Sequence, residues 1–178
     1  RRRAEGDHNR AARLEQIAAD ALSSTTDLPY ANDVAVVTGM TPASIGGAVV
    51  GGLLAGGATV IATSSSISAS RLAFAKELYR THAAGGAKLW LVPANLASYR
   101  DVDALVEWIG PEQTKSVGAA VKVTKEALVP TLFYPFAAPR VSGTLADAGP
   151  ASENQMRLLL WSVERSIAGL CAIGSDTH

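Results

Sequence analysis

The chain has 178 residues, of which 48% are hydrophobic and 18% charged, and a domain of this length buries most of its apolar surface. Its 16 Lys and Arg balance 16 Asp and Glu, so no overall field attracts nucleic acid, and Arg1–Arg3 is interpreted as a solvated run. No stretch has the pattern of a membrane span or a signal peptide. We expect one globular domain in the cytoplasm, without nucleic-acid or membrane partners.

The first expected element is an amphipathic helix over residues 9–22, where apolar residues recur at helical spacing. Residues 23–29 are rich in Ser and Thr and end in proline, a composition typical of a loop. Residues 1–29 are therefore predicted to be a helix and linker that precede a core of residues 30–178.

Strands and helices then alternate along the core. The β-branched run Val34–Thr38 has no polar alternation, as expected of a parallel strand buried on both faces. A helix follows, with Ile45, Ala48, Val49 and Leu53 predicted to share one stripe and Gly56 to end it. The same order repeats in a strand over 59–63, a helix over 70–84 and a strand over 88–92.

The second half of the core is less regular. Ser98 to Asp101 resembles a capping box at the start of a helix that ends at Gly110. A polar segment, 112–126, precedes a fourth strand within 129–138. A last helix is predicted to be capped by Ser152, with Gly174 beyond its end, and to bury one stripe: Met156, Leu159, Leu160, Val163, Ile167 and Leu170. The lone cysteine, Cys171, is expected to be a buried small hydrophobe. The fold class is α/β, a partial Rossmann-type doubly wound parallel sheet of about four strands with an N-terminal helix.

Small residues fill the turn between the first strand and its helix. Gly39 permits a sharp turn, Ser44 can cap the helix or donate to a phosphate, and Gly46 allows close approach. Because a helix N-terminus presents unpaired amides and partial positive charge, such a turn can bind the pyrophosphate of a dinucleotide. The alternative is a purely structural turn.

The end of the second strand favours NADPH over NADH. No Asp or Glu occurs between Asp33 and Glu77, whereas NAD sites commonly have an acidic ribose reader about 20 residues past the glycines. The strand ends instead in Thr63-Ser64-Ser65-Ser66, followed by Arg71. Hydroxyl donors and a cation suit a 2′-phosphate. Arg71 as an exposed helix residue and the serine run as a plain loop remain alternatives.

The sequence over 34–47 resembles the opening of the short-chain dehydrogenases/reductases, with one residue more than their common Thr-Gly-x-x-x-Gly-x-Gly turn. Together with segments 56–63, 89–95, 103–109 and 135–139, it is similar to the ketoreductase region of type I fatty acid synthases, in their actinobacterial, mycobacterial-like form. The resemblance extends from about Tyr30 to Gly174.

This resemblance implies that NADPH reduces a 3-oxoacyl chain carried on acyl carrier protein, within a cytoplasmic, homo-oligomeric multienzyme whose other domains are partners. Carried over by position, residues at the pyrophosphate are Gly39, Thr41, Ser44, Ile45 and Gly46. Residues at the adenosine phosphate are Thr63, Ser64 and Ser65, and those beside adenine are Asn95 and Leu96. Ala137 and Ala138 fall near the nicotinamide. The family commonly has glycine where Ala43 stands.

The family's proton donor is a Tyr followed four residues later by Lys. The tyrosines here are followed at that spacing by Val34, Ala83, Asp103 and Ala138, so the motif is absent. Residues 30–178 are therefore predicted to be the NADPH-binding portion of a ketoreductase domain, truncated before its catalytic segment and inactive alone. The histidines have no metal-ligand spacing, and Trp90, Trp108 and Trp161 are assigned to core packing.

Three other readings stay open: a noncatalytic Rossmann scaffold, another carbonyl reductase of the short-chain dehydrogenase type, and a nucleotide-binding transferase. The scaffold predicts a folded chain without NADPH binding. The transferase predicts an acidic ribose reader, which the serine run disfavours.

Overall fold

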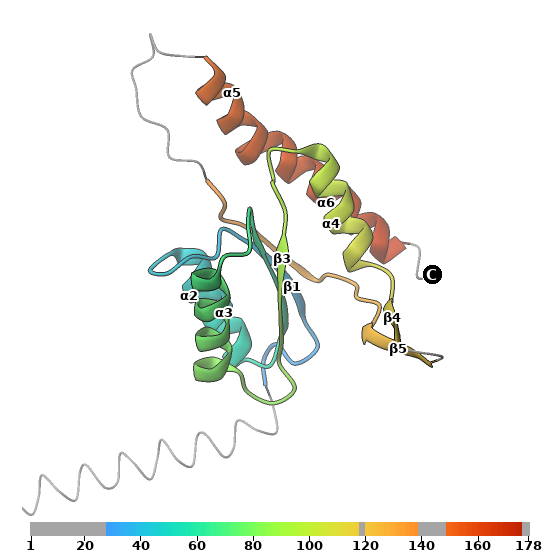
Figure 1. Ribbon diagram of the computed structural model, residues 1–178. Coiled ribbons are helices and arrows are strands. Elements are labelled where there is room, and N and C mark those ends of the chain that lie inside the picture. The colour runs from blue at the N-terminus through green and yellow to red at the C-terminus, as the bar shows by residue number, and fades with distance from the viewer. Residues whose placement is uncertain (1–27, 118–119, 139–148, 176–178) are drawn as a thin grey trace, which may run out of the picture.

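The computed structural model describes residues 28–117, 120–138 and 149–175, so the helix expected over 9–22 lies outside the described residues. Figure 1 shows a central sheet with helices on both sides. The elements in chain order are β1 (Val34–Thr38), α2 (Ile45–Ala55), β2 (Thr59–Ser64), α3 (Ala69–His82), β3 (Lys88–Pro93), α4 (Tyr99–Ile109), β4 (Gln113–Val117), β5 (Ala120–Lys125), β6 (Leu132–Pro135), α5 (Pro150–Met156), the π-helical turn η2 (Arg157–Trp161) and α6 (Ser162–Ser175).

The main sheet has four parallel strands in the order β3-β2-β1-β6. Val36 in β1 lies opposite Ile61 in β2 and Phe133 in β6. The chain therefore moves outward from β1 to β3 and returns to the other side of β1 as β6. Ligands in such sheets bind at the carboxyl ends of the strands, where the order reverses. This arrangement confirms the predicted Rossmann-type fold.

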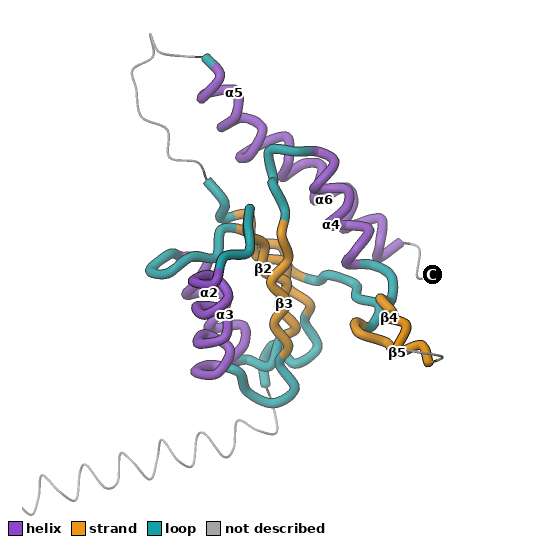
Figure 2. The backbone as a smooth tube through the Cα atoms, viewed as in Figure 1, coloured by secondary structure: helices purple, strands orange, loops and turns teal. Residues whose placement is uncertain are grey.

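Helices cover both faces of the sheet (Figure 2). On one face, Val37 and Val60 pack with Leu54 of α2 in a cluster that reaches Phe74 of α3. On the other face, Ile61 packs with Ile109 of α4 and Leu170 of α6, among other residues. Strands β1 and β2 are buried apart from their first residues, as their lack of polar alternation predicted.

The apolar stripe predicted for α2 is half right. Leu53 is buried and Val49 packs against the core, but Ile45 is 70% exposed and Ala48 is also exposed. Half of the buried residues of the helix are glycines: Gly46, Gly47 and Gly51, beside Val50, Leu53 and Leu54. Glycines let the helix approach the turn and α3 closely: a Cβ at Gly46 would lie 2.8 Å from the carbonyl oxygen of Gly39. A hydrophobicity pattern cannot reveal the part of this face that consists of glycines, because glycine has no side chain.

The polar segment 112–126 forms a hairpin that the sequence did not predict. Strands β4 and β5 pair antiparallel, with a register shift near Gln113. The hairpin ends in Lys125, which is 3% exposed and donates through Nζ to the carbonyls of Ile109, Pro111 and Glu126 at 2.9, 2.9 and 2.7 Å. This lysine anchors the hairpin to the C-terminal end of α4.

The last helix runs without a break from α5 through η2 to α6, and several expectations about it are wrong. Its N-cap is Gly149 rather than Ser152, Gly174 lies inside α6, and Cys171 is exposed. The predicted buried stripe is largely exposed, with Met156, Leu159, Leu160 and Ile167 each 41–47% accessible. Trp161 is likewise 38% exposed rather than packed in the core.

Helix α6 packs on α4 through Arg165, Gly169 and Leu170, and it buries two serines toward the ends of β1 and β6. Ser162 and Ser166 are 2% and 6% exposed, and Ser166 donates to the carbonyl of Ser162 at 2.6 Å. Arg165 forms two hydrogen bonds with the Asp103 carboxylate, at 2.6 and 2.7 Å. A Cβ at Gly169 would lie 2.9 Å from the Val106 side chain. None of the helices in the described residues is long and apolar enough to cross a membrane.

Candidate functional site

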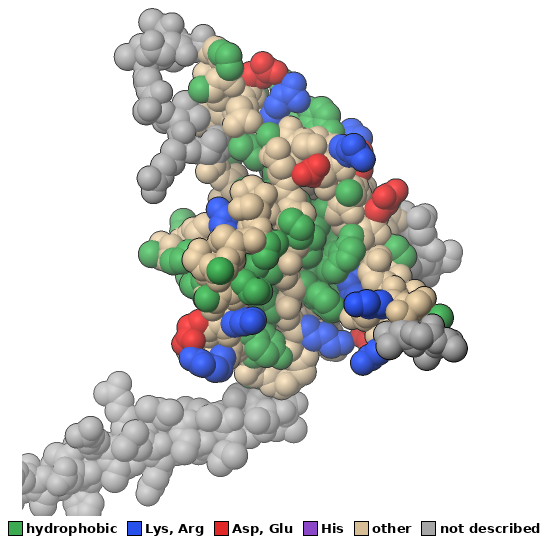
Figure 3. Space-filling model, viewed as in Figure 1, with side chains coloured by type: hydrophobic (Ala, Val, Ile, Leu, Met, Phe, Trp, Pro, Cys, Tyr) green, Lys and Arg blue, Asp and Glu red, His purple; other side chains and the backbone are tan. Residues whose placement is uncertain are grey.

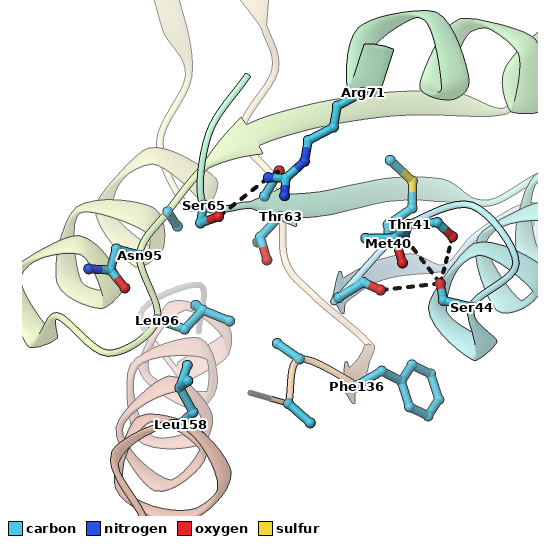
Figure 4. Close-up of a pocket in the computed structure, with 15 residues that line it drawn as sticks. Met40, Thr41, Ser44, Thr63, Ser65, Arg71, Asn95, Leu96, Phe136 and Leu158 are labelled. Atoms are coloured by element: carbon cyan, nitrogen blue, oxygen red, sulfur yellow. Dashed lines mark hydrogen bonds between the residues drawn. The ribbon is translucent and has the colours of Figure 1, made fainter. Parts of the chain in front are cut away.

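A cavity of about 440 Å³ opens at the carboxyl ends of the strands, where the strand order reverses (Figure 4). Segments that follow β1, β2, β3 and β6 converge on it, together with one residue of η2. Its lining consists of Gly39, Met40, Thr41, Ser44, Thr63, Ser64, Ser65, Arg71, Ala94, Asn95, Leu96, Phe136, Ala137, Ala138 and Leu158.

Gly39 shapes the turn after β1. Its φ is +75°, and a Cβ there would lie 2.8 Å from the backbone of Phe136 and Ala137. The Ala137 N–H donates to Thr38 Oγ1 at 2.9 Å. Gly39 therefore lets the segment after β6 pass close to the end of β1, and this contact closes one side of the cavity.

Ser44 is the N-cap of α2 and is saturated by its own turn. Its Oγ accepts from the N–H groups of Gly47 and Thr41 at 3.0 and 3.1 Å and donates to the Thr41 carbonyl at 2.7 Å. The predicted capping role is therefore observed. Because a hydroxyl has one hydrogen, donation to a phosphate would require the hydrogen bond from Ser44 to the Thr41 carbonyl to break. The N-terminal end of α2, with its partial positive charge, borders the cavity.

Ala43 has a φ of +56° and is the one non-glycine residue with positive φ in the described part of the chain. This left-handed conformation brings an L side chain close to the backbone and raises its energy by roughly 1–2 kcal/mol. The family that the sequence resembles commonly has glycine at position 43, and glycine adopts this conformation at lower energy than alanine does.

Arg71 turns back from α3 onto the serine-rich end of β2, as Figure 4 shows. Its Nη1 donates to Ser64 Oγ, and it lies 3.3 Å from Ser65 Oγ and 3.2 Å from the Ser66 carbonyl. Its backbone N–H donates to the N-cap residue Ser68 at 3.2 Å. Arg71 is thus not a fully exposed helix residue, and its guanidinium lies beside two hydroxyls at the cavity wall.

The loop after β3 is held rigidly. The Asn95 N–H donates to Asp101 Oδ2 at 2.9 Å, and its side-chain oxygen accepts from Ala97 at 3.2 Å. Ser98 caps α4 by accepting from the Asp101 N–H at 3.3 Å and donates to Asp101 Oδ1 at 3.1 Å. The predicted N-cap is confirmed, but the Asp101 carboxylate accepts from the Asn95 N–H rather than from the Ser98 N–H of a capping box. Ser162 of α6 donates to the Leu96 carbonyl, so this wall of the cavity is tied to the last helix.

Eleven of the thirteen expected site residues line this cavity; Ile45 and Gly46 do not. Ile45 is solvent-exposed, and Gly46 faces the Gly39 carbonyl. Sequence reasoning missed Met40, Ala94, Phe136 and Leu158. The first three adjoin expected residues, whereas Leu158 lies on a helix that only the fold brings to the cavity.

The lining residues give the cavity a cationic character. Among the described residues that line it, Arg71 is the one charged residue and none is a carboxylate. None of the four tyrosines lines it either: Tyr79, for instance, lies near the C-terminal end of α3 and donates to the Ala87 carbonyl at 3.0 Å. Within the described residues no cluster of His, Cys, Asp or Glu is suited to a metal. The site can hold an elongated, anionic ligand.

No family model matches the chain, but individual proteins do. The chain is 48% identical over 86 residues to fatty acid synthase alpha subunit pigJ of Monascus ruber, a match that covers 48% of this chain and 5% of the relative. Against the fatty acid synthase subunit alpha of Cochliobolus carbonum, identity is 30% over 149 residues, covering 83% of this chain and 9% of the relative. The subunit alpha of Schizosaccharomyces pombe is 42% identical over 86 residues, covering 48% and 5%.

Solved structures show the same fold. A metagenomic short-chain oxidoreductase in complex with NADP has a TM-score of 0.60 at 16% identity, covering 81% of this chain and 57% of that chain. A metagenomic blue fluorescent protein in complex with NADPH has a TM-score of 0.58 at 23% identity, covering 79% and 50%. The fold is thus that of the short-chain dehydrogenases/reductases.

The sequence matches indicate a narrower group of relatives than the fold does. It is homologous to a region of fatty acid synthase alpha subunits and spans 5–9% of the length of the curated relatives described above.

Proposed function

We propose that the cavity binds NADPH and that the chain is the cofactor-binding portion of a 3-oxoacyl-[acyl-carrier-protein] reductase in a cytoplasmic type I fatty acid synthase. One observation carries the cofactor assignment. Arg71 and the hydroxyls of Ser64 and Ser65 meet at the end of β2, with no carboxylate among the described residues of the cavity lining. A 2′-phosphate is stabilised by such a group of donors, whereas the 2′-hydroxyl of NADH prefers a carboxylate.

The rest of the cavity accommodates the remaining parts of the cofactor. The turn from Gly39 to Ser44 would hold the pyrophosphate at the N-terminal end of α2, and Asn95 and Leu96 would flank adenine. Ala137 and Ala138, on the segment that Gly39 brings close to β1, would lie toward the nicotinamide. When bound, NADPH supplies the hydride; the chain's own residues bind and orient it.

Proton delivery would come from outside this chain. The chain has no Tyr-x-x-x-Lys sequence, and no tyrosine lines the cavity. Since ketone reduction needs a proton donor at the developing alkoxide, the chain alone would bind NADPH without reducing a ketone. Acyl carrier protein and the other domains of an oligomeric multienzyme would be its partners. A measurable reduction of an acetoacetyl thioester by the purified chain would contradict this.

Calorimetric titration of the purified chain with NADPH and NADH tests the cofactor assignment. We expect tighter binding of NADPH, and Arg71→Ala is expected to weaken NADPH by roughly 10- to 100-fold, the range for hydrogen bonds to a charged group. NADH binding should change little in this variant. Arg80→Ala is the matched control, because Arg80 lies on the same helix and pairs with Glu77 at the surface.

Two outcomes of this titration would overturn the proposal. Equal affinity for NADPH and NADH would show that Arg71 and the serines do not recognise a 2′-phosphate. A folded chain that binds neither dinucleotide would favour the noncatalytic scaffold.

A further inference from the structure

The outer edge of the sheet carries a second candidate site, which the cofactor does not use. Strand β3 is the last strand on its side of the sheet in the described residues. Its Lys88 N–H donates to β2 through Ala58, and the Ala94 N–H just beyond its end donates to Ser64. Because N–H groups alternate in direction along a strand, those of Leu89 and Leu91 point away from β2, at the free edge.

Hollows lie on both faces of this edge. One, between β3 and α3, is lined by Leu89 and Leu91 together with Leu72, Ala75 and Tyr79. The other, between β3 and α4, is lined by Val92 and Pro93 together with Ala104, Leu105 and Trp108. Leu72 and Tyr79 are 41% and 43% exposed. Figure 3 shows hydrophobic side chains gathered on this face, with basic side chains around them.

The two ends of the edge limit what can pair with it. Pro93 has no N–H to donate. At the other end, Lys88 pairs with Glu126 at 2.9 Å and so ties the hairpin segment to the start of β3. The pairing surface is therefore short and centred on Leu89 and Leu91, too short for open-ended sheet growth but sufficient for one added strand.

The charges beside the hollows select for an acidic partner. Lys76 borders the hollow on the α3 side and Arg100 the hollow on the α4 side. Both are exposed, and neither forms an ion pair with another described residue. Asp101, the carboxylate in the second hollow, is occupied by the Asn95 N–H and Ser98.

We infer that the β3 edge binds an extended polypeptide segment as an added strand. Side chains of an added strand alternate between the two faces of the sheet, and the hollows on both faces are largely apolar. The occupant would therefore have consecutive apolar residues, as in a strand buried on both sides, flanked by carboxylates that reach Lys76 and Arg100.

Two synthetic peptides of opposite charge test this inference: EEVLVVEE and KKVLVVKK, each blocked at both ends. Amide hydrogen exchange is measured on the purified chain with and without each peptide. The acidic peptide is expected to slow exchange at Leu89 and Leu91 by about tenfold or more, and the lysine peptide to leave it unchanged. The double variant Lys76→Glu/Arg100→Glu should exchange these preferences.

Lys122→Glu is the charge control, because Lys122 is exposed on the hairpin and lines neither hollow. The inference is overturned if neither peptide protects these two amides, if protection appears only elsewhere, or if reversing Lys76 and Arg100 leaves the preference unchanged. NADPH titration of the same variants should match the unmodified chain, since neither residue lines the cofactor cavity.

Discussion

Ala43 is the residue where the chain stores conformational energy beside its candidate cofactor site. With φ at +56°, an alanine is disfavoured by roughly 1–2 kcal/mol, partly offset by the smaller backbone entropy of its unfolded state. We predict that Ala43→Gly raises the free energy of unfolding by about 1 kcal/mol. Urea denaturation measures this, and a lower unfolding free energy in the variant would contradict it.

Gly46 and Gly52 allow a paired test on one helix. A Cβ at Gly46 would lie 2.8 Å from the Gly39 carbonyl oxygen, whereas nothing lies within 4 Å of a Cβ at Gly52. Gly46→Ala is predicted to lower the unfolding free energy by roughly 1–3 kcal/mol and to weaken NADPH binding by displacing the turn. Gly52→Ala should raise it by roughly 0.5–1 kcal/mol, through helix propensity. Thermal melts and titrations of both variants check this; a neutral effect at Gly46 would count against the close approach.

Among individual site residues, the sequence predicted those whose position depends on a neighbouring turn or strand end. Gly39, Ser44 and Ser64 stand within or beside recognisable turns and strand ends, so their place at the cavity followed from chain order. Leu158 could not be found this way, because its place depends on how the last helix docks. Ile45 was misplaced because half of the buried residues of α2 are glycines, which a hydrophobic stripe does not register.

Among the elements, the β4–β5 hairpin depends on one buried lysine. Lys125 Nζ donates to three carbonyls, and burial lowers its pKa below 10.5. Lys125→Met retains much of the apolar stem but leaves those carbonyls without a donor. It is predicted to destabilise the chain by about 1–3 kcal/mol.

Lys122→Met is the control for this substitution, on the exposed part of the same strand, and should stay within about 0.5 kcal/mol. Denaturant unfolding of the two variants distinguishes them. Equal effects would show that Lys125 does not anchor the hairpin.

The docking of α6 on α4 is predicted to weaken in acid. The hydrogen bond from Arg165 holds the pKa of Asp103 below its usual 3.8, against a smaller opposing effect of desolvation. A carboxyl with a lowered folded-state pKa stabilises the fold above the unfolded pKa and loses this contribution as the pH falls through the folded value. The difference in stability between the unmodified chain and Asp103→Asn should therefore be full at neutral pH and become smaller below about pH 4. Melting temperatures across this range test it, and a difference independent of pH would contradict it.

Elements with strong periodicity or strand-like composition were predictable, and those set by tertiary contacts were not. Strands β1 and β2 and the N-cap of α4 appear where the sequence indicated. The last helix was predicted as a helix, but much of the wrong face was expected to be buried. Ser162 and Ser166 are buried and Gly169 lies close to Val106 of α4, whereas four of the six residues of the apolar stripe are exposed. The hairpin has no strong apolar alternation, and its anchor is a lysine, a residue type rarely buried.

For the whole molecule, cofactor binding is expected to depend on one arrangement: a four-stranded Rossmann-type sheet with its cavity at the point where the strand order reverses. Four separate chain segments after β1, β2, β3 and β6 meet there, and the relatives in sequence are fatty acid synthase alpha subunits. The far edge of the same sheet presents backbone groups and apolar hollows to the proposed added strand. The described lining residues of the two sites do not overlap, and Arg71, Lys76 and Arg100, which the tests change, each line one site alone.

A crystal structure of the chain with NADP⁺ would show whether the cavity holds the dinucleotide. We predict the pyrophosphate at the turn from Gly39 to Ser44 and the 2′-phosphate within hydrogen-bonding distance of the Arg71 guanidinium and the Ser64 or Ser65 hydroxyl. A 2′-phosphate that points into solvent, or a dinucleotide bound away from the carboxyl ends of β1 and β2, would contradict the assignment of this cavity as an NADPH site.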